Sequence, residues 1–167
     1  MPLASRQSSH RTNRLLAALP RQDFAQLAPH LERVELKKGI VLYETHESMP
    51  FVYFPHEAIV SLMTDLPDGR TVEMAVLGSE AMVGSASTLV TRQSLGHHVV
   101  HIAGLASRID TAVLHRAFED RPTLRKLFLR SDEALLPQAL QTMACKIVHS
   151  VEARCCRWIL TMRDRAS

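Results

Sequence analysis

Short apolar runs separated by turn-forming residues fill the middle of the chain. In the run TVEMAVL, apolar residues fall on alternate positions from Val72 to Val76 and would share one face of a strand. Asp68-Gly69 lies between two such runs and is a typical hairpin turn. No long helical pattern interrupts the series, so it predicts an antiparallel β-sandwich or barrel. The strand-like runs are VELKKGIVLYE, FVYF, AIVSLMTDL, TVEMAVL and HHVVHIAGLASRI.

Helical spacing of apolar residues flanks this region on both sides. Before it, TNRLLAALPRQDFAQLAPHLERV predicts two short helices, the first of which ends at Pro20. After Ile109 the apolar period becomes helical, and Asp110 is suitably placed to cap a helix over TAVLHRAFED. Pro122 then suits the first turn of a second, longer helix. The pattern as a whole predicts a mixed α+β domain.

The long helix is expected to reach about residue 149, a length of about 40 Å. Because a small β domain is shorter than this, part of the apolar stripe would face a second copy of the chain; the alternative is a helix that lies wholly on its own domain. The spacing is close to that of a coiled-coil seam. Pro137 removes a backbone donor, which predicts a kink after Glu133 or a helix in two pieces. The predicted dimer seam consists of Leu129, Leu136, Leu140, Met143 and Ile147.

A final amphipathic segment, VEARCCRWILTMRDRAS, follows Ser150, its expected N-cap. Its apolar residues recur at helical spacing, and its charged residues mostly take the other side. Such a stripe normally packs against a next element, so we expect it to contact a further domain. The residues of this terminal stripe are Val151, Cys155, Trp158, Ile159 and Met162.

Charge and composition narrow the choice of function. The 167 residues have a net charge of +3, which comes from the residues after position 120. A basic end is typical of proteins that meet nucleic acid, but a solvated helix face has the same composition. Three clustered cysteines argue against a disulfide framework and favour a reducing cytoplasm. No run is apolar enough to span a membrane, and residues 1–13 lack a signal-peptide core and are expected to be flexible.

Two stretches give this order of elements a family resemblance. VYFPHEAIVSLMTDLPDGRTVEMAVLGSEAMVG resembles the sensor-domain core of one subgroup of the Crp/Fnr superfamily of bacterial transcription regulators. RPTLRKLFLRSDEALLPQALQTMACKIVHSVEARCCRWILTMRDR resembles the dimerisation helix of that superfamily where it enters the DNA-binding domain. The resemblance covers most of the chain from about Leu15. It implies an antiparallel β-roll of the cyclic-nucleotide-binding type, flanked by short helices, then a dimerisation helix and a winged helix-turn-helix.

The resemblance also implies a division of the chain. Residues 14–120 would form the sensor domain, residues 121–149 the dimerisation helix, and residues 150–167 the first helix of a truncated DNA-binding domain. A signal in the β-roll would shift the paired helices between two arrangements and so reorient the attached DNA-binding heads. The implied partners are a second copy of the chain, an unknown small-molecule effector and, in a full-length form only, promoter DNA. No membrane partner is expected.

The candidate ligand pocket departs from the family pattern. Relatives that bind cyclic AMP hold its phosphate with an Arg-Ser pair after a Gly-Glu turn. In the comparable stretch RQSLGHHVV, Arg92 comes early, and Ser94 and Leu95 stand roughly where the pair belongs. We therefore expect a sensor that does not depend on this phosphate cassette. The candidate pocket residues are Glu80, Ser85, Arg92 and Ser94.

The remaining histidines and cysteines predict no catalytic or metal centre. Strand alternation would place His98 opposite His97 and His101, and nothing fixes further ligands, so no metal or other cofactor is expected. Cys145 and His149 share a helix face and suit a buried thiol beside a helix-end imidazole. No nucleophile elbow or phosphate-binding glycine loop is present, so no enzyme activity is expected. The alternative function is a stand-alone module that senses a small molecule or forms inactive dimers with longer relatives.

Overall fold

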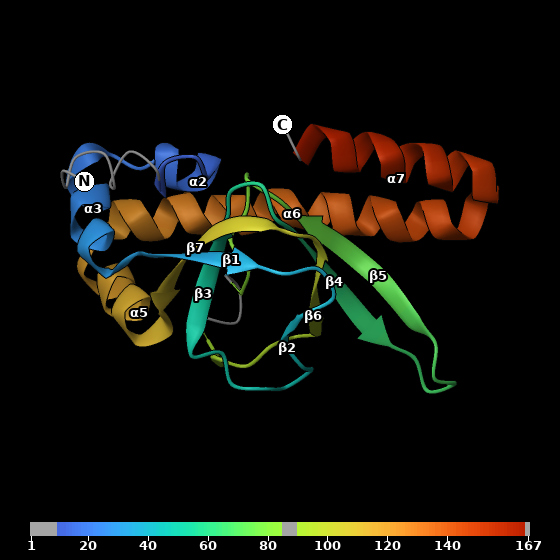
Figure 1. The fold of residues 1–167 in the computed structure, drawn as a ribbon, viewed down its shortest axis with the longest axis horizontal. Coiled ribbons are helices and arrows are strands. Elements are labelled where there is room, and N and C mark those ends of the chain that lie inside the picture. The colour runs from blue at the N-terminus through green and yellow to red at the C-terminus, as the bar shows by residue number, and fades with distance from the viewer. Residues whose placement is uncertain (1–9, 85–89, 166–167) are drawn as a thin grey trace.

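The computed structural model describes residues 10–84 and 90–165. Within these ranges, seven antiparallel strands form two facing sheets (Figure 1), with strand orders β1-β7-β3 and β2-β6-β4-β5. This arrangement confirms the predicted antiparallel β-roll. The strands are β1 (Glu32–Leu36), β2 (Val41–Tyr43), β3 (Phe51–Pro55), β4 (Ile59–Asp65), β5 (Thr71–Leu77), β6 (His97–Ile102) and β7 (Gly104–Asp110).

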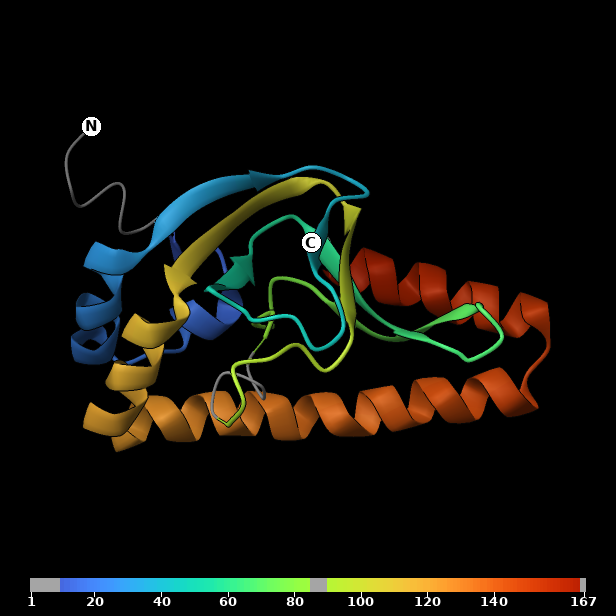
Figure 2. The same ribbon diagram turned by 90° about the horizontal axis from the view of Figure 1, so that it is seen from below.

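The helices gather at one end of the roll and along one side of it (Figures 1 and 2). Asp110 caps α5, because its Oδ1 accepts hydrogen bonds from the amides of Ala112 at 2.7 Å and Val113 at 3.2 Å. Pro122 occupies the first turn of α6, as its fixed φ favours. Both features were predicted from the sequence. The helical elements are α2 (Arg14–Ala17), α3 (Arg21–Leu27), the 3-10 turn η1 (Ala28–His30), α5 (Thr111–Asp120), α6 (Pro122–Val148) and α7 (Val151–Arg165).

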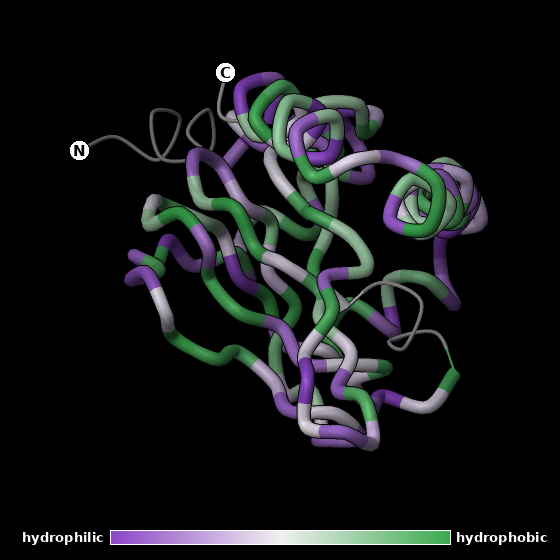
Figure 3. The backbone as a smooth tube through the Cα atoms, turned by 90° about the vertical axis from the view of Figure 1, so that its right-hand side faces the viewer, coloured by the Kyte–Doolittle hydropathy of each residue, from purple (hydrophilic) through white to green (hydrophobic). Residues whose placement is uncertain are grey.

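The largest apolar core lies where α2, α3, α5 and the first half of α6 meet the three-stranded sheet. The ring of Phe128 lies 5.2 Å from that of Phe118 and 5.9 Å from that of Phe54, measured between centroids. A second core fills the inside of the roll. Buried residues alternate with half-buried ones along much of β3 and β6, so one face of each of these strands is buried. Figure 3 shows hydrophobic and hydrophilic residues interspersed along the backbone. The first half of α6 is therefore fixed to the roll.

The β4–β5 hairpin turns at Gly69, where φ is +82°. Glycine adopts this left-handed conformation at no steric cost, so the turn needs it. The Asp68-Gly69 hairpin predicted from the sequence is thereby confirmed.

The prediction of a flexible N-terminus up to residue 13 is wrong for its last residues. Asn13 is fully buried, and its Nδ2 donates to the carbonyl oxygens of Pro55 at 2.8 Å and Ala81 at 3.0 Å. His10 is also buried, with Nδ1 2.7 Å from the hydroxyl oxygen of Ser107. These buried hydrogen bonds hold the segment on the roll. The earlier residues of the segment lie outside the described part of the chain.

α6 passes through Pro137 as one helix of 27 residues. Of the two predicted alternatives, a helix in two pieces is therefore wrong. Proline leaves the carbonyl of Glu133 without its helical donor, but both residues are exposed, so water can satisfy that carbonyl. Neither α6 nor any other helix in the described ranges is long and apolar enough to cross a membrane.

α7 turns back and runs beside the second half of α6 (Figure 2). Met162 was expected to contact a further domain, but it is buried against Ile59 and Val76 of the roll. The sheet offers an apolar spot there, and burying a thioether side chain on it is favourable. Trp158 touches the roll at one edge, with its ring 5.3 Å from that of His101. The residues of the terminal stripe that stay exposed are Val151, Cys155, Trp158 and Ile159.

Candidate functional site

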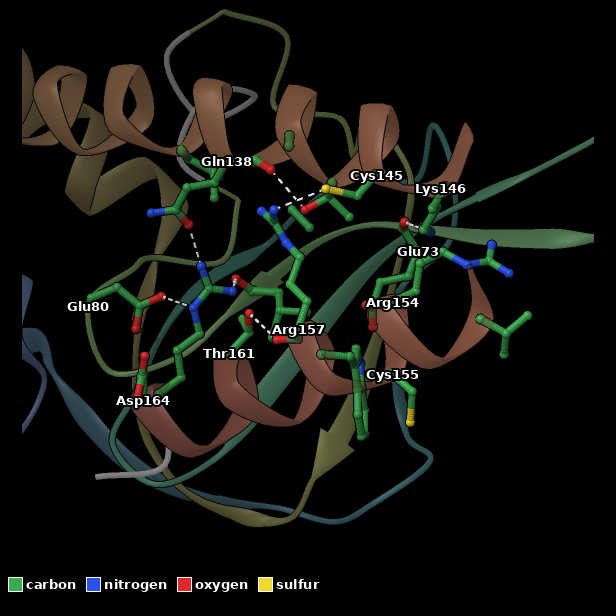
Figure 4. Close-up of a pocket in the computed structure, with 18 of the residues that line it drawn as sticks. Glu73, Glu80, Gln138, Cys145, Lys146, Arg154, Cys155, Arg157, Thr161 and Asp164 are labelled. Atoms are coloured by element: carbon green, nitrogen blue, oxygen red, sulfur yellow. Dashed lines mark hydrogen bonds and ion pairs between the residues drawn. The ribbon is translucent and has the colours of Figure 1, made fainter. Parts of the chain in front are cut away.

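A cavity of about 610 Å³ lies between β5, the second half of α6 and α7 (Figure 4). Its volume falls within the range of small-molecule sites in proteins. We call it the α7 cavity. Its apolar wall consists of Ala75, Val76, Leu135, Ala139 and Trp158.

Arg165 closes one end of the α7 cavity and joins three elements. Its Nε lies 2.9 Å from Oε1 of Glu80, and its guanidinium also donates to the carbonyl oxygen of Val76 and to Oε1 of Gln138. A Cβ on Gly78 would lie only 2.8 Å from Cβ of Arg165. The sequence therefore places a glycine where α7 comes close to the roll.

Arg157 reaches across the α7 cavity from α7 to α6 (Figure 4). Its Nη1 donates to Sγ of Cys145 at 3.1 Å, and Gln141 Nε2 donates to the same sulfur at 3.5 Å. Cys145 is buried, as its position on the helix predicted. A thiol is a weak acceptor, and no ion pair joins Arg157 to a carboxylate within residues 10–84 and 90–165.

Lys146 and Arg154 bring two further positive charges to the same wall. Lys146 Nζ donates to the carbonyl oxygen of Glu73. Burial lowers the pKa of Lys146; the Glu73 carboxylate opposes this shift, and the positive charge of Arg154 adds to it. The Glu73 carboxylate also accepts from the hydroxyl of Ser61 at 2.7 Å. Nε of Arg154 is enclosed and has no hydrogen-bond partner within the described residues.

Only Glu80 of the predicted pocket residues lines the α7 cavity. Ser94 is buried elsewhere, with its hydroxyl oxygen 2.9 Å from Nδ1 of His98. Arg92 is exposed in the connection to β6, with φ at +56°. Ser85 lies outside the described residues. The structure thus does not bring Arg92 and Ser94 to this cavity.

The basic residues of the cavity were overlooked because they lie on helices far from β5 in the sequence. Arg154 and Arg157 were assigned to the solvated side of the last helix. Their spacing of three residues does put them on one helix face, which was the available signal. What the pattern could not show is that α7 folds back so that this face meets α6.

The three histidines of β6 lie in different surroundings. His98 lies on the face of β6 opposite His97, as strand alternation predicted; this face points into the roll, and burial lowers the pKa of His98 to about 4. His97 Nδ1 lies 2.7 Å from a carboxylate oxygen of Glu44, and His101 contacts Trp158. No group of three His, Cys, Asp or Glu side chains suited to a metal ion occurs within residues 10–84 and 90–165.

Comparison with known proteins assigns the fold. No protein-family model matches the sequence, and a search of curated proteins found no match. Among solved structures, the chain is similar to the N-terminal domain of a transcriptional regulator from Streptomyces coelicolor A3(2), with 24% identity over 80% of this chain and 94% of that chain and a TM-score of 0.58. A cyclic nucleotide-binding domain from Methylobacillus flagellatus aligns with 11% identity over 87% and 88% of the two chains, with a TM-score of 0.70.

The c-di-GMP responsive global regulator CLP of Xanthomonas campestris is also similar, with 14% identity, 84% of this chain and 70% of that chain covered, and a TM-score of 0.68. At these identities the likeness establishes the fold. The chain therefore has the fold of cyclic nucleotide-binding domains, the antiparallel β-roll that the sequence resemblance implied.

Proposed function

We propose that this chain is the sensor and dimerisation portion of a Crp/Fnr-type DNA-binding transcription regulator. The observation that carries the proposal is a row of large apolar side chains exposed along one face of α6. Contiguous exposed apolar surface of this kind is typical of protein interfaces, and its spacing is that of a helix pair. The α6 ridge consists of Leu129, Leu136, Leu140, Met143 and Ile147, which are 43%, 60%, 58%, 41% and 85% exposed.

The α6 ridge and the α7 cavity use different faces of the same helix. At about 100° per residue, the ridge positions and the positions that line the cavity are centred roughly 120° apart. A second copy of the chain can therefore pack on the ridge while α7 stays on the roll. A ligand in the cavity would contact both α6, which joins the copies, and α7, which the family resemblance makes the first helix of a DNA-binding domain. Ligand binding would thus bias the arrangement of the DNA-binding heads.

Sedimentation velocity tests the dimer. We expect the wild-type chain to sediment as a dimer at micromolar concentration and the double variant Leu140→Glu/Met143→Glu to sediment as a monomer, because two carboxylates would be buried in the seam. The matched control is Ala134→Glu/Gln141→Glu, which adds the same charge at the same helix on exposed positions away from the ridge. A wild-type monomer, or equal dissociation of both double variants, would contradict the proposal.

The proposal includes independence from the cyclic AMP phosphate cassette. Arg92 is exposed, and the hydroxyl of Ser94 is bound within the roll, so neither supports a phosphate fork. Calorimetric titration with cyclic AMP should give the same result with the wild-type chain and with Arg92→Ala. Tight binding that Arg92→Ala abolishes would show that the cassette operates despite its altered sequence.

One observation favours a second candidate function, a binding module that does not itself bind DNA. Met162 and Arg165 close α7 on its own roll, so the cavity is complete within this chain. A gel-shift series in salt distinguishes the two candidates. The sensor portion alone should bind DNA only non-specifically and lose that binding as salt rises, whereas a module that does not bind DNA should give no shift even at low salt.

A further inference from the structure

We propose that the α7 cavity binds a small organic anion, a carboxylate or a phosphate ester, between Arg154 and Arg157, and that this ligand fastens α7 to α6. The anion binding itself does not depend on dimerisation. Only the passage of the signal from α7 to an attached DNA-binding unit rests on the function proposed above.

The charges that line the cavity are unbalanced. Five basic residues face three acidic ones, and the acidic ones already have partners. Glu80 is paired with Arg165, the Glu73 carboxylate accepts from Ser61, and Asp164 lies 3.4 Å from the Arg163 guanidinium. The basic residues are Arg14, Lys146, Arg154, Arg157 and Arg165, and the acidic ones are Glu73, Glu80 and Asp164.

Arg157 and Arg154 have donors to spare. A guanidinium has five N–H donors in a fixed fork. The hydrogen bond that the structure gives the Arg157 side chain goes to the Cys145 sulfur, and the enclosed Nε of Arg154 has no acceptor within the described residues. Carboxylate and phosphate oxygens match such forks and accept charge-assisted hydrogen bonds. An anion here would give Arg157 a stronger acceptor than the Cys145 sulfur. It would also give the Nε of Arg154 an acceptor, which that atom lacks within the described residues.

The apolar wall decides the class of the ligand. Leu135, Ala139 and Trp158 lie on the same cavity as the arginines. A bare inorganic ion would leave this wall uncovered, whereas an organic anion would cover it with its carbon skeleton or ring. The cavity volume of about 610 Å³ has room for a molecule of metabolite size.

The ligand would hold α6 and α7 together because it would contact residues of both helices. Arg154 and Arg157 belong to α7, while Lys146 belongs to α6 and stands close enough to Arg154 for their charges to repel. An anion between them would replace this repulsion by attraction to both sides. α7 should therefore be held more firmly on α6 and the roll when the ligand is bound.

The test is a calorimetric titration with two probes, citrate for the carboxylate arm and adenosine monophosphate for the phosphate-ester arm, each at constant ionic strength. At least one probe should bind the wild-type chain and the control Arg130→Gln alike, since Arg130 is exposed on α6 and does not line the cavity. Arg157→Gln and Arg154→Gln should each weaken binding by about ten-fold or more. Binding of citrate alone or of the phosphate ester alone would identify which source the site prefers.

Two results would overturn the proposal: neither probe binds the wild-type chain, or the bound probe binds all four proteins equally. Melting in chloride buffer checks that each variant folds, and Arg157→Lys, which keeps the charge but loses the fork, serves if Arg157→Gln does not. Amide exchange of α7 should slow when the probe binds. The titration is repeated on Leu140→Glu/Met143→Glu, so that failure of the cavity and failure of the dimer give separate results.

Discussion

The two halves of α6 carry the same kinds of apolar residue but place them in opposite environments. In the first half, Leu124 and Phe128 are fully buried against α5 and the three-stranded sheet. In the second half, Leu136 and Leu140 are 60% and 58% exposed. Helical periodicity is the same throughout, so what differs is what lies opposite. One helix can therefore be anchored on the roll at one end and leave an apolar surface exposed at the other.

The largest expected difference between the two halves of α6 is in the stability lost when an apolar side chain is truncated. Phe128→Ala should lower the free energy of unfolding by about 3–5 kcal/mol, because it removes a ring from a closed cluster and leaves a cavity. Leu136→Ala, made in the Leu140→Glu/Met143→Glu background so that association does not contribute, should change it by less than about 0.5 kcal/mol. Urea denaturation measures both. Similar losses at the two positions would mean that the second half of α6 is buried on its own roll.

The inside of the roll and the exposed strand faces should respond differently to pH. Burial lowers the pKa of both His56 and His98 to about 4. Between that value and the ordinary histidine pKa of about 6.5, the unfolded chain binds more protons than the folded one, so stability falls as pH falls. Each residue should contribute up to about 3 kcal/mol. Burial raises the pKa of Asp132 to about 6, which acts in the opposite direction over part of this window.

Melting temperatures between pH 7.5 and pH 4.5 test this difference. The wild-type chain should lose stability steadily below about pH 6.5, and His98→Gln should flatten the slope. His97→Gln, on the opposite face of β6, is the matched control and should not flatten the slope, because the imidazole of His97 lies outside the core beside the Glu44 carboxylate. A pH-independent melting temperature in the wild-type chain would contradict the burial of His98.

Variants that weaken the packing of α7 on the roll should have the smallest effect on global stability. Gly78→Ala would push a Cβ into Arg165, and Arg165→Gln would remove its pairing with Glu80. Both should speed proteolysis within α7, while the global free energy of unfolding changes by less than about 1 kcal/mol, because α7 can detach locally. Arg163→Gln should behave like the wild type. Unchanged cleavage in the first two variants would mean that α7 is held by other contacts.

The sequence was sufficient to predict the strands and helices, but it did not predict that α7 folds back onto α6 and the roll. Strand alternation, the Asp110 cap and Pro122 are local signals, and local signals place strands and helix ends reliably. The direction of α7 depends on a two-residue link after Val148 and on the missing side chain of Gly78, neither of which has a periodic signature. Met162 was therefore assigned to a further domain, although it packs on its own roll.

In the candidate site, too, sequence signals were informative only where the position of a residue does not depend on the tertiary fold. Glu80 comes three residues after the end of β5, and the family resemblance made it a candidate pocket residue. Arg154 and Arg157 come from a helix that reaches β5 only through the tertiary fold, and their shared helix face does not by itself reveal which element it meets. Conversely, Ser94 was a candidate to bind a ligand, but its hydroxyl is hydrogen-bonded to the imidazole of His98.

Cysteine crosslinking along α6 tests most directly whether the α6 ridge joins two copies. In a Cys155→Ser/Cys156→Ser background, Leu140→Cys should form a disulfide-linked dimer under mild oxidation, because facing seam positions of a helix pair bring their Cα atoms within disulfide range. Ala134→Cys, exposed on another face of the same helix, should stay monomeric on a non-reducing gel. Crosslinking at position 134 but not at position 140, or at neither position, would contradict the account.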